Sequence, residues 1–391
     1  MDNLTHTLVA ATLASTPLGR AGRGTTAALI IASNLPDIDI VTTAGGAISY
    51  LQWHRGPTHG PIGIIGLGLA TAAIVSLAYR VMAPLTASAN ATAVRRSSER
   101  RRKRDPTVEN ADVASFGMLA IVSTIGVLLH VLMDLPTSYG VRVLSPFSWR
   151  WFAADWMPII DVPLIIVLAA GLLFGGRSPA ARRWNAVIVL MLMAANYGLR
   201  AAEHHQALVL APRLLGPTLP QPCDLAATQS AVIDSWPRPP IAMPTLPAGK
   251  RCLVEIAAMP TFVSPFSWRV LVQMSNGYEM FEIDLLDARF STPPSEHDVF
   301  WRRVRRYANV WTPAVERAAT THLGRVYLGF SRFPAVRTSV DQEGVTTVRW
   351  EDMRFADRPM SPNPNNPRPN LFTAVVRIGG DGQILEERLG R

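Results

Sequence analysis

Long apolar stretches dominate the first 200 residues of the chain and predict helices that cross a membrane. Residues 61–79 carry no charged side chain, and residues 113–133 carry His130 as their one ionisable group. Each stretch is close to the roughly 20 apolar residues that a spanning helix needs. Residues 162–176 and 184–199 are shorter uncharged runs, which reach a spanning length with flanking residues such as Met157–Ile160. We therefore predict two further spans, over 157–176 and 184–201.

The chain begins with two apolar stretches that are too short to span a membrane separately. They cover residues 7–18 and 24–36, and Gly19–Gly24 predicts a turn between them. We expect a helical hairpin that packs tightly among the spans or re-enters the membrane from one side. We interpret the N-terminus as part of the mature protein, since Met1–Ala14 lacks the basic start of a signal peptide.

The second half of the chain has the mixed composition of a soluble domain. Alternating apolar and polar residues predict strands, and two segments have helical spacing. The predicted strands are Val270–Met274, Tyr278–Leu285, Arg325–Phe330, Val345–Trp350 and Leu371–Ile378, and the predicted helices are Glu296–Ala308 and Pro313–His322. The predicted fold is a mainly α-helical multi-span membrane domain, residues 1–202, followed by a small extracytoplasmic α+β domain, residues 203–391.

The placement of charge argues for a membrane and against a nucleic-acid partner. The chain carries a net charge of +9, yet only 17% of its residues are charged, against about 25% in a soluble protein. Basic residues cluster in the loop 80–112, which holds Arg95–Arg104, and in the turn 177–183. Clusters of this kind mark cytoplasmic loops. With both loops inside, Arg20 and Arg23 also fall inside, and the second domain lies outside the cell's inner membrane.

Both cysteines, Cys223 and Cys252, lie in the second domain. A disulfide between them needs an oxidising compartment, which the predicted topology provides. Two unpaired structural cysteines are the alternative reading.

Histidine and aspartate gather in four short motifs of the first domain. The motifs are Met1–His6, Pro36–Asp39, His54–His59 and His130–Asp134. Asp2 and His6, like His130 and Asp134, are spaced i, i+4 and share one helix face. The topology, which was derived from arginine and lysine alone, places all four motifs at the extracytoplasmic boundary of the membrane. We therefore predict that they form one site.

Imidazole and carboxylate groups are good ligands for zinc and other divalent metals. We predict metal ligation, with one to three ions and zinc the expected metal. The predicted ligands are His6, Asp37, Asp39, His54, His59, His130 and Asp134. Two adjacent metals would generate hydroxide and stabilise a displacement. Arg55 is a natural clamp for a phosphate-like anion, and Thr58 can hydrogen-bond a ligand or substrate.

A structural reading exists for each motif taken alone. A single His or Asp at a membrane boundary is often only solvated, and Pro36–Asp39 can be a turn that caps a helix. Asp155 and Asp161 fall on the same face, where Asp161 suits a helix cap better than a late ligand. Ionisable residues at a membrane boundary nevertheless often have a functional role. The presence of four such motifs on one face favours the metal site.

These motifs resemble those of the YdjM-like membrane-bound metal-dependent hydrolases, over roughly residues 1–165. The resemblance implies a metal-dependent hydrolase of the cytoplasmic (inner) membrane, with these His and Asp residues as candidate ligands. The arrangement is more loosely similar to zinc-dependent phospholipase C and nuclease enzymes. Those enzymes use a free-amine ligand, which is not evident in a chain that begins with Met1.

The leading hypothesis is hydrolysis of an ester by metal-activated water at the outer face of the membrane. Phosphoesters and lipid headgroups are the candidate substrates, and the expected partners are membrane lipids or an envelope protein. The alternative is a non-enzymatic, metal-stabilised membrane scaffold that binds an envelope partner. A transporter fits less well, because the polar residues crowd one boundary and do not run through the midplane.

One hexapeptide occurs twice, as Ser145–Arg150 and as Ser264–Arg269. Both copies lie on the predicted outer side. Since Trp and Arg commonly anchor proteins in the headgroup region, we interpret both copies as membrane anchors.

Overall fold

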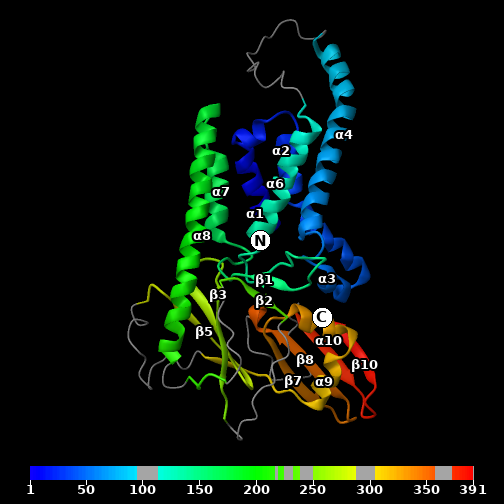
Figure 1. The fold of residues 1–391 in the computed structure, drawn as a ribbon, viewed down its shortest axis with the longest axis vertical. Coiled ribbons are helices and arrows are strands. Elements are labelled where there is room, and N and C mark those ends of the chain that lie inside the picture. The colour runs from blue at the N-terminus through cyan, green and yellow to red at the C-terminus, as the bar shows by residue number, and fades with distance from the viewer. Residues whose placement is uncertain are drawn as a thin grey trace.

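Helices form one layer of the molecule and two β-sheets form the other (Figure 1). The computed structural model describes residues 1–94, 113–215, 219–223, 232–237, 250–287, 304–356 and 372–390, with the side chains of 82–94 and 214–215 excepted. The basic loop of Arg95–Arg104 lies outside these residues. The helical layer contains α1 (Asn3–Ala14), α2 (Thr25–Ala32), the 3₁₀ helix η2 (Leu35–Gly45), α3 (Ala47–Trp53), α4 (Pro61–Val94), α6 (Phe116–Asp134), α7 (Val162–Phe174) and α8 (Pro179–Leu215).

Helix α6 is the centre of the helical layer, packed against both α2 and α4. It begins where Ser115 accepts a hydrogen bond from the Met118 backbone, a standard N-cap. Small residues let the backbones approach. A Cβ added at Gly126 would lie 2.9 Å from the Cβ of Ala32 on α2, so only glycine fits there. This close contact places the last turns of α6 beside the end of α2.

Three helices are long and apolar enough to cross a membrane, within the part of the chain that the structure describes. They are Pro61–Val81 of α4, Phe116–Asp134 and Pro179–Arg213 of α8. Helix α2 and η2, which are bent by 41° at a short break, qualify together as a broken span or a re-entrant loop. The predicted short hairpin at the start of the chain is thus present as α1 and α2, which pack against each other.

The predicted span 157–176 is shorter than expected. Helix α7 has 13 residues, or about 20 Å at 1.5 Å per residue, which is less than the ~30 Å hydrocarbon core. Met157–Ile160 do not extend it, because Met157 instead forms a bridge with Thr137. The helix starts only where Asp161 caps it, with Pro163 in its first turn.

The second layer contains two four-stranded antiparallel sheets, in the orders β3-β4-β5-β6 and β10-β9-β8-β7. The strands are β3 (Leu253–Pro260), β4 (Ser267–Met274), β5 (Gly277–Asp284), β6 (Arg305–Ala308), β7 (Pro334–Val340), β8 (Thr346–Asp352), β9 (Thr373–Ile378) and β10 (Ile384–Leu389). The short helices α9 (Pro313–Ala319) and α10 (His322–Phe330) pack on the second sheet. The predicted β-rich C-terminal half is therefore confirmed.

Two predicted elements of this half are wrong. Arg325–Phe330 lies in helix α10, where Leu323, Tyr327 and Phe330 are buried at helical spacing. Residues 305–308 of the predicted helix Glu296–Ala308 form strand β6, which pairs with β5. Residues 296–303 lie outside the described part of the chain.

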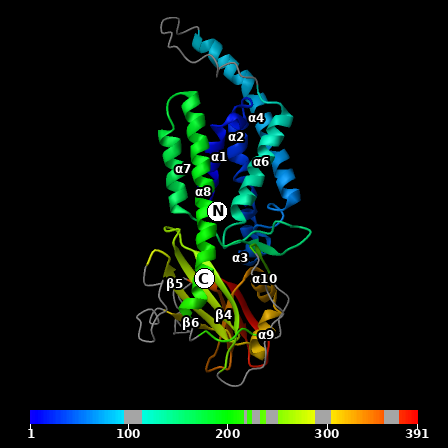
Figure 2. The ribbon, with the colours of Figure 1, turned by 60° about the vertical axis from the view of Figure 1, so that its left-hand side comes forward.

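Helix α8 joins the two layers without a break (Figure 2). Its 37 residues run from the helical layer down to the first sheet, where Ala207 and Ala211 pack against Trp268 and Val270 of β4. The predicted boundary near residue 202 falls inside this helix. The division at that residue remains a prediction.

A second junction between the layers is a short two-stranded sheet. Strand β1 (Trp151–Ala153), which follows α6, pairs with β2 (Asp234–Trp236) from the second half. Their indole rings, Trp151 and Trp236, stack with centroids 6.0 Å apart. Arg332 forms ion pairs with Asp155, Asp234 and Glu255. These three carboxylates raise the pKa of the Arg332 guanidinium in spite of its burial.

Cys223 and Cys252 form a disulfide, which settles the alternative that the sequence leaves open.

The two copies of the hexapeptide have different surroundings. Phe147 and Trp149 of the first copy are 77% and 40% exposed, whereas Trp268 of the second is fully buried in β4. The interpretation as a membrane anchor is therefore wrong for the second copy.

Candidate metal centre

The last two turns of α6 supply His130 and Asp134 to the candidate site. Both side chains are fully buried, and their i, i+4 spacing puts them on one helix face. The His130 Nδ1 atom lies 2.8 Å from the carbonyl oxygen of Ser33, at the end of α2. Because a carbonyl can only accept, Nδ1 carries the proton and donates it. The Nε2 lone pair of His130 is therefore free for a ligand.

The segment Arg55–Gly60 links α3 to α4 and brings His59 to His130. Arg55 adopts φ = +50°, a left-handed conformation that turns the chain back at the end of α3. Gly60 lies so close to the Ser145 carbonyl that an added Cβ would overlap that oxygen. Thr58 Oγ1 is 2.9 Å from His59 Nδ1 and 3.5 Å from an Asp39 oxygen. With Nδ1 held by Thr58, the Nε2 of His59 faces His130.

The third element is η2, which carries Asp37 in its first turn after Pro36. One Asp37 oxygen lies 3.7 Å from His59 Nε2 and 3.6 Å from His130 Nε2. Its side chain is 18% exposed, whereas those of the other three members are 0% exposed. Asp37 is therefore the member of the site that is most accessible to solvent.

Asp37, His59, His130 and Asp134 form a group that can hold a metal ion. Each offers one ligand atom, and these four atoms all lie within 4.8 Å of one another. The two Nε2 atoms are 3.3 Å apart, and an Asp134 oxygen lies 3.6 and 3.4 Å from them. Burial, and then the nearby His130, lower the pKa of the His59 imidazole well below its ordinary value. His59 is therefore neutral at physiological pH, the form that binds metal.

Imidazole nitrogens and carboxylate oxygens that face one another in a buried site are stabilised by a bound cation. Two imidazole nitrogens and two carboxylates converge here, and one of the carboxylates, Asp134, already pairs with Arg55 and contacts the Met1 amino nitrogen. Both ring nitrogens of the adjacent His6 are buried without a hydrogen-bond partner, and buried polar atoms without one are explained by, among others, a bound ion. A mixed nitrogen and oxygen donor set of four suits zinc and other divalent transition metals. The donor set thus fits a metal ion, and leaves the identity of the metal open.

Asp39 and His54 adjoin this group without belonging to it. Asp39 accepts a hydrogen bond of 2.6 Å from the Arg55 backbone and lies 3.1 Å from His54 Nδ1. His54 ends α3 and stacks on Tyr50. Both residues hold the Arg55–Gly60 segment in place, which positions His59. Metal ligation by Asp39 and His54 remains a prediction.

Arg55 adjoins the candidate site and forms an ion pair with Asp134. Its NH2 group is 3.1 Å from an Asp134 oxygen, and its NH1 group donates to the Gly140 carbonyl. Its guanidinium also stacks over the Tyr139 ring, 4.8 Å from the centroid. The buried Nε has no hydrogen-bond partner. The predicted anion-binding role of Arg55, and that of Thr58 toward a substrate, remain predictions.

His6 of α1 closes the site on the side of His130. Their rings stack with centroids 3.9 Å apart, and His6 Nε2 lies 3.5 Å from an Asp134 oxygen. Neither ring nitrogen of His6 has a hydrogen-bond partner. Asp2 does not face the site, because it caps α1 through Thr5. The Met1 amino nitrogen contacts Asp134.

The two acidic residues before α7 have structural partners. Asp161 caps α7 through the Leu164 backbone and pairs with the buried Arg200 of α8 at 2.5 Å. Asp155 pairs with Arg332. The reading of Asp161 as a helix cap agrees with this geometry.

Two functional contributions have no signal in the sequence. Ser33 acts through its backbone carbonyl, so its residue type is uninformative. Tyr139 contacts both Arg55 and His54, and its other side packs against Phe330 and Phe372 of the second half. It carries the contact between the site and the sheet layer, which becomes visible only when the chain is folded.

The chain is similar to one curated protein. Uncharacterized protein YfhP of Bacillus subtilis (strain 168) is 25% identical over 167 residues, which cover 42% of this chain and 41% of that protein. The chain thus spans less than half the length of this relative. No solved structure matches the chain. The comparisons lend no support to the looser resemblance to phospholipase C and nuclease enzymes.

The family comparison covers every residue of the candidate site. The model of the YdjM inner membrane protein family matches residues 1–207, which is more than half of the chain and includes α1 to the lower part of α8. The spanning helices, the candidate metal group and this match agree, and the chain belongs to the YdjM inner membrane protein family.

Proposed function

We propose that this protein is a metal-dependent hydrolase that cleaves an ester at the outer surface of the inner membrane. Phosphoesters and lipid headgroups are the proposed substrate classes. The observation that carries the proposal is the convergence of His59 Nε2 and His130 Nε2 at 3.3 Å, with both Nδ1 atoms held by other groups. A cation bound by both Nε2 atoms would take the place of the contact that they make with each other.

A metal held by Asp37, His59, His130 and Asp134 would supply an activated water molecule at neutral pH. The residues of the chain have separate tasks. The Ser33 carbonyl fixes the tautomer of His130, and Thr58 orients the ring of His59. Arg55 offsets the charge of Asp134 and leaves Nε for an anionic group. His6, whose ring nitrogens lack hydrogen-bond partners, is placed to ligate a further ion or to exchange a proton.

Two observations support an extracytoplasmic sheet layer. Arg20 donates a hydrogen bond to the Pro179 carbonyl, so the α1–α2 and α7–α8 turns with their basic residues lie at one end of the helices. That end is opposite to the sheets (Figure 1). Basic ends of spanning helices face the cytoplasm. The Cys223–Cys252 disulfide fits an oxidising compartment on the other side.

Metal analysis tests the proposal. Full-length protein purified in detergent without chelators should contain stoichiometric metal, and His59→Ala and His130→Ala should lose it. His322→Ala is the matched control, since His322 lies at the start of α10, away from the site. Wild-type protein without stoichiometric metal would overturn the metal site.

Activity is tested with the same proteins on phosphodiesters, phosphomonoesters and phospholipids. Hydrolysis that follows metal content across the variants supports the proposed enzyme. Metal without hydrolysis of any ester would favour the metal-stabilised scaffold.

A further inference from the structure

A cavity of about 350 Å³ lies between α3 and α10, next to the candidate metal centre. Its lining includes Trp53, Trp149, Arg142 and Arg325. Arg142 connects it directly to the site, because its backbone donates a 3.1 Å hydrogen bond to the Arg55 carbonyl. Trp149 also reaches the site segment, where a Cβ added at Gly56 would lie 3.2 Å from its ring. Two residues that line the cavity, Arg142 and Trp149, thus contact the segment that carries His59.

Arg142 is a buried cation without a carboxylate partner. Its residue is 5% exposed, and its guanidinium lies over the rings of Trp149 and Trp151 at 5.2 and 4.3 Å. It donates to the Gln52 carbonyl, while its buried Nε has no hydrogen-bond partner. No carboxylate among the residues that the structure describes forms an ion pair with it. Burial lowers the pKa of Arg142 to about 10, so the group remains charged at neutral pH.

The second guanidinium of the cavity belongs to Arg325, an exposed residue of α10. It donates to the Thr320 carbonyl, and within the described part of the chain it pairs with no acidic side chain. None of the eight lining residues is acidic. Two positive charges against aromatic walls form a site for an anion, and guanidinium groups suit phosphate oxygens in particular.

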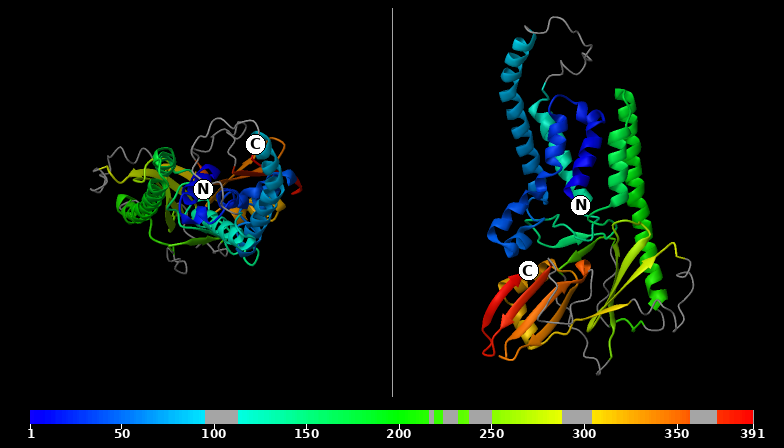
Figure 3. Two further views of the ribbon diagram at one scale, coloured as in Figure 1. Left: turned by 90° about the horizontal axis from the view of Figure 1, so that it is seen from above. Right: turned by 180° about the vertical axis from the view of Figure 1, so that it is seen from behind.

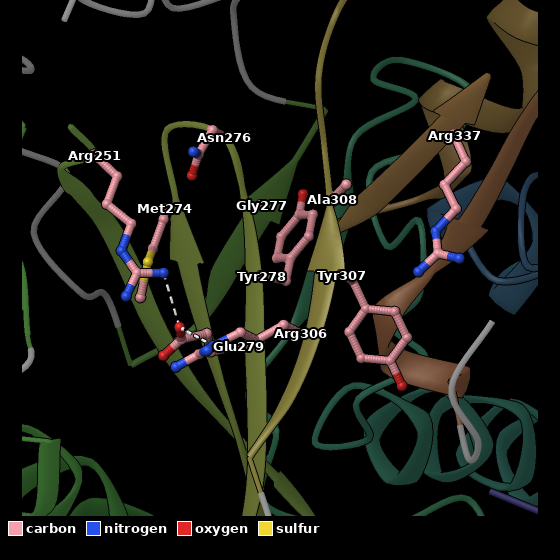
Figure 4. A pocket seen from close by; sticks show the side chains of 10 residues that line it. All are labelled: Arg251, Met274, Asn276, Gly277, Tyr278, Glu279, Arg306, Tyr307, Ala308 and Arg337. Atoms are coloured by element: carbon pink, nitrogen blue, oxygen red, sulfur yellow. Dashed lines mark hydrogen bonds and ion pairs between the residues drawn. The ribbon is translucent and has the colours of Figure 1, made fainter. Parts of the chain in front are cut away.

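A second cavity shows the contrasting case (Figure 4). It lies in the first sheet, where Arg251 and Arg306 are also close together. There both guanidiniums point to Glu279 and bind the same oxygen, at 2.8 and 3.0 Å. Glu279 compensates one of these two charges and holds both guanidiniums, whereas Arg142 and Arg325 have no carboxylate partner among the described residues.

The position of the first cavity indicates a lipid as the source of the anion. The N-terminus and α3 lie at the level where the helical layer meets the sheets (Figure 3). Beside the cavity, Leu144, Phe147 and Trp149 are 46%, 77% and 40% exposed. Exposed apolar and aromatic side chains just beyond spanning helices belong to the membrane interface, where lipid phosphates lie.

We propose that the Arg142–Arg325 cavity binds the phosphate group of an anionic phospholipid, whose headgroup then lies beside the candidate metal centre. Arg142 and Arg325 contact the phosphate oxygens, and Trp53 and Trp149 pack against the glycerol and the first acyl carbons. The proposal rests on the proposed function only where it makes this lipid a substrate. Binding itself requires no hydrolysis.

Native mass spectrometry of the full-length protein in detergent tests the binding. The protein is titrated with phosphatidylglycerol, with phosphatidylcholine, and with phosphatidylglycerol in excess inorganic phosphate. Phosphatidylglycerol should bind at least about tenfold more tightly than phosphatidylcholine, and Arg325→Gln should reduce its affinity about tenfold, the usual effect of one charge-assisted hydrogen bond. Arg142→Gln should act in the same direction. Arg325 is exposed, so its variant is expected to fold even where the Arg142 variant does not.

Arg150→Gln is the matched control. Arg150 is an exposed arginine of the loop that carries Arg142 and Trp149. It donates a hydrogen bond to Ser235 and does not line the cavity. An equal loss in Arg150→Gln and Arg325→Gln, or no loss in Arg325→Gln, would contradict the proposal. Displacement of phosphatidylglycerol by the excess inorganic phosphate would show a site for free anions and would also contradict the proposal. The mass of the bound lipid reports whether it is intact, so the outcome for binding is separate from that for hydrolysis.

Discussion

The Nε2 atoms of His59 and His130 lie 3.3 Å apart, although the two residues are 71 positions apart in the chain. Each ring is held from behind, by Thr58 and by the Ser33 carbonyl. The contact therefore depends on three separate segments: the end of α2, the Arg55–Gly60 segment and the end of α6. Predictions about the site follow from how each segment is fixed.

Asp37 and Asp39 should differ in what they contribute to metal binding. Asp37→Asn removes a charged ligand atom, and we expect the protein to lose stoichiometric metal. Asp39→Asn weakens the support of Arg55 and His54, and we expect affinity to fall about 10- to 100-fold, as for other residues behind ligands. Titration of metal-free protein measures both affinities. An equal loss of affinity in the two variants would contradict the assignment of Asp37, and not Asp39, to the metal-binding group.

Gly126 should be required for the metal site although it lies outside it. A valine there would overlap Ala32 and push α6 away from α2, which separates His130 from Ser33. Overpacking of this kind costs about 1–3 kcal/mol. We expect Gly126→Val to lower both the Tm and the metal content.

Gly117→Val is the matched control for this substitution, because it lies on the same helix and a Cβ there meets nothing within 4 Å. A normal metal content in Gly126→Val would show that the packing of α2 and α6 does not position His130.

Arg200 and Asp161 form a buried ion pair between α8 and the start of α7. Arg200→Met leaves the Asp161 carboxylate buried without its partner, and we expect a loss of about 3–5 kcal/mol in unfolding free energy. Adding Asp161→Asn removes the stranded charge and keeps a side chain that can cap α7. The double variant should therefore be more stable than Arg200→Met alone, in unfolding experiments in detergent. Strictly additive losses would argue against the pair.

Acid should destabilise the metal-free protein through His59. Its pKa is lowered in the folded state, mainly by burial, whereas the unfolded chain binds a proton near pH 6.5. The unfolded state thus binds more protons below that pH, and folding stability falls as the pH drops further. We expect a Tm that declines below about pH 6.5. His59→Gln, which cannot be protonated, should show a smaller decline; an unchanged decline would assign it to other groups.

The sequence predicts the members of the site better than their roles. Histidine and aspartate are costly at a membrane boundary, so their presence in four motifs is already informative in the unfolded sequence. Spacing does not distinguish Asp37 from Asp39, however. The 3₁₀ turn of η2 sends one carboxylate to the histidines and the other to the Arg55 backbone. His54 and His59 are separated in the same way by the left-handed turn at Arg55.

The fold is predictable where apolar length decides it, and less so where short segments depend on their neighbours. Helices α4 and α6 follow from uninterrupted apolar runs. Arg325–Phe330 has the aromatic and branched residues of a strand, but the cap at Thr321 and burial against the second sheet make it helical. Residues 305–308 become a strand because they pair with the edge of β5. Such outcomes depend on tertiary contacts that a local pattern does not contain.

Helix α8 is one rod that belongs to both layers. Its upper part lies among the membrane helices, and its lower part forms a wall of the core beneath β3 and β4. No hinge separates the two parts, since the helix is unbroken from Pro179 to Leu215. The first sheet is therefore packed directly on the continuation of a candidate spanning helix, and no loop lies between the two.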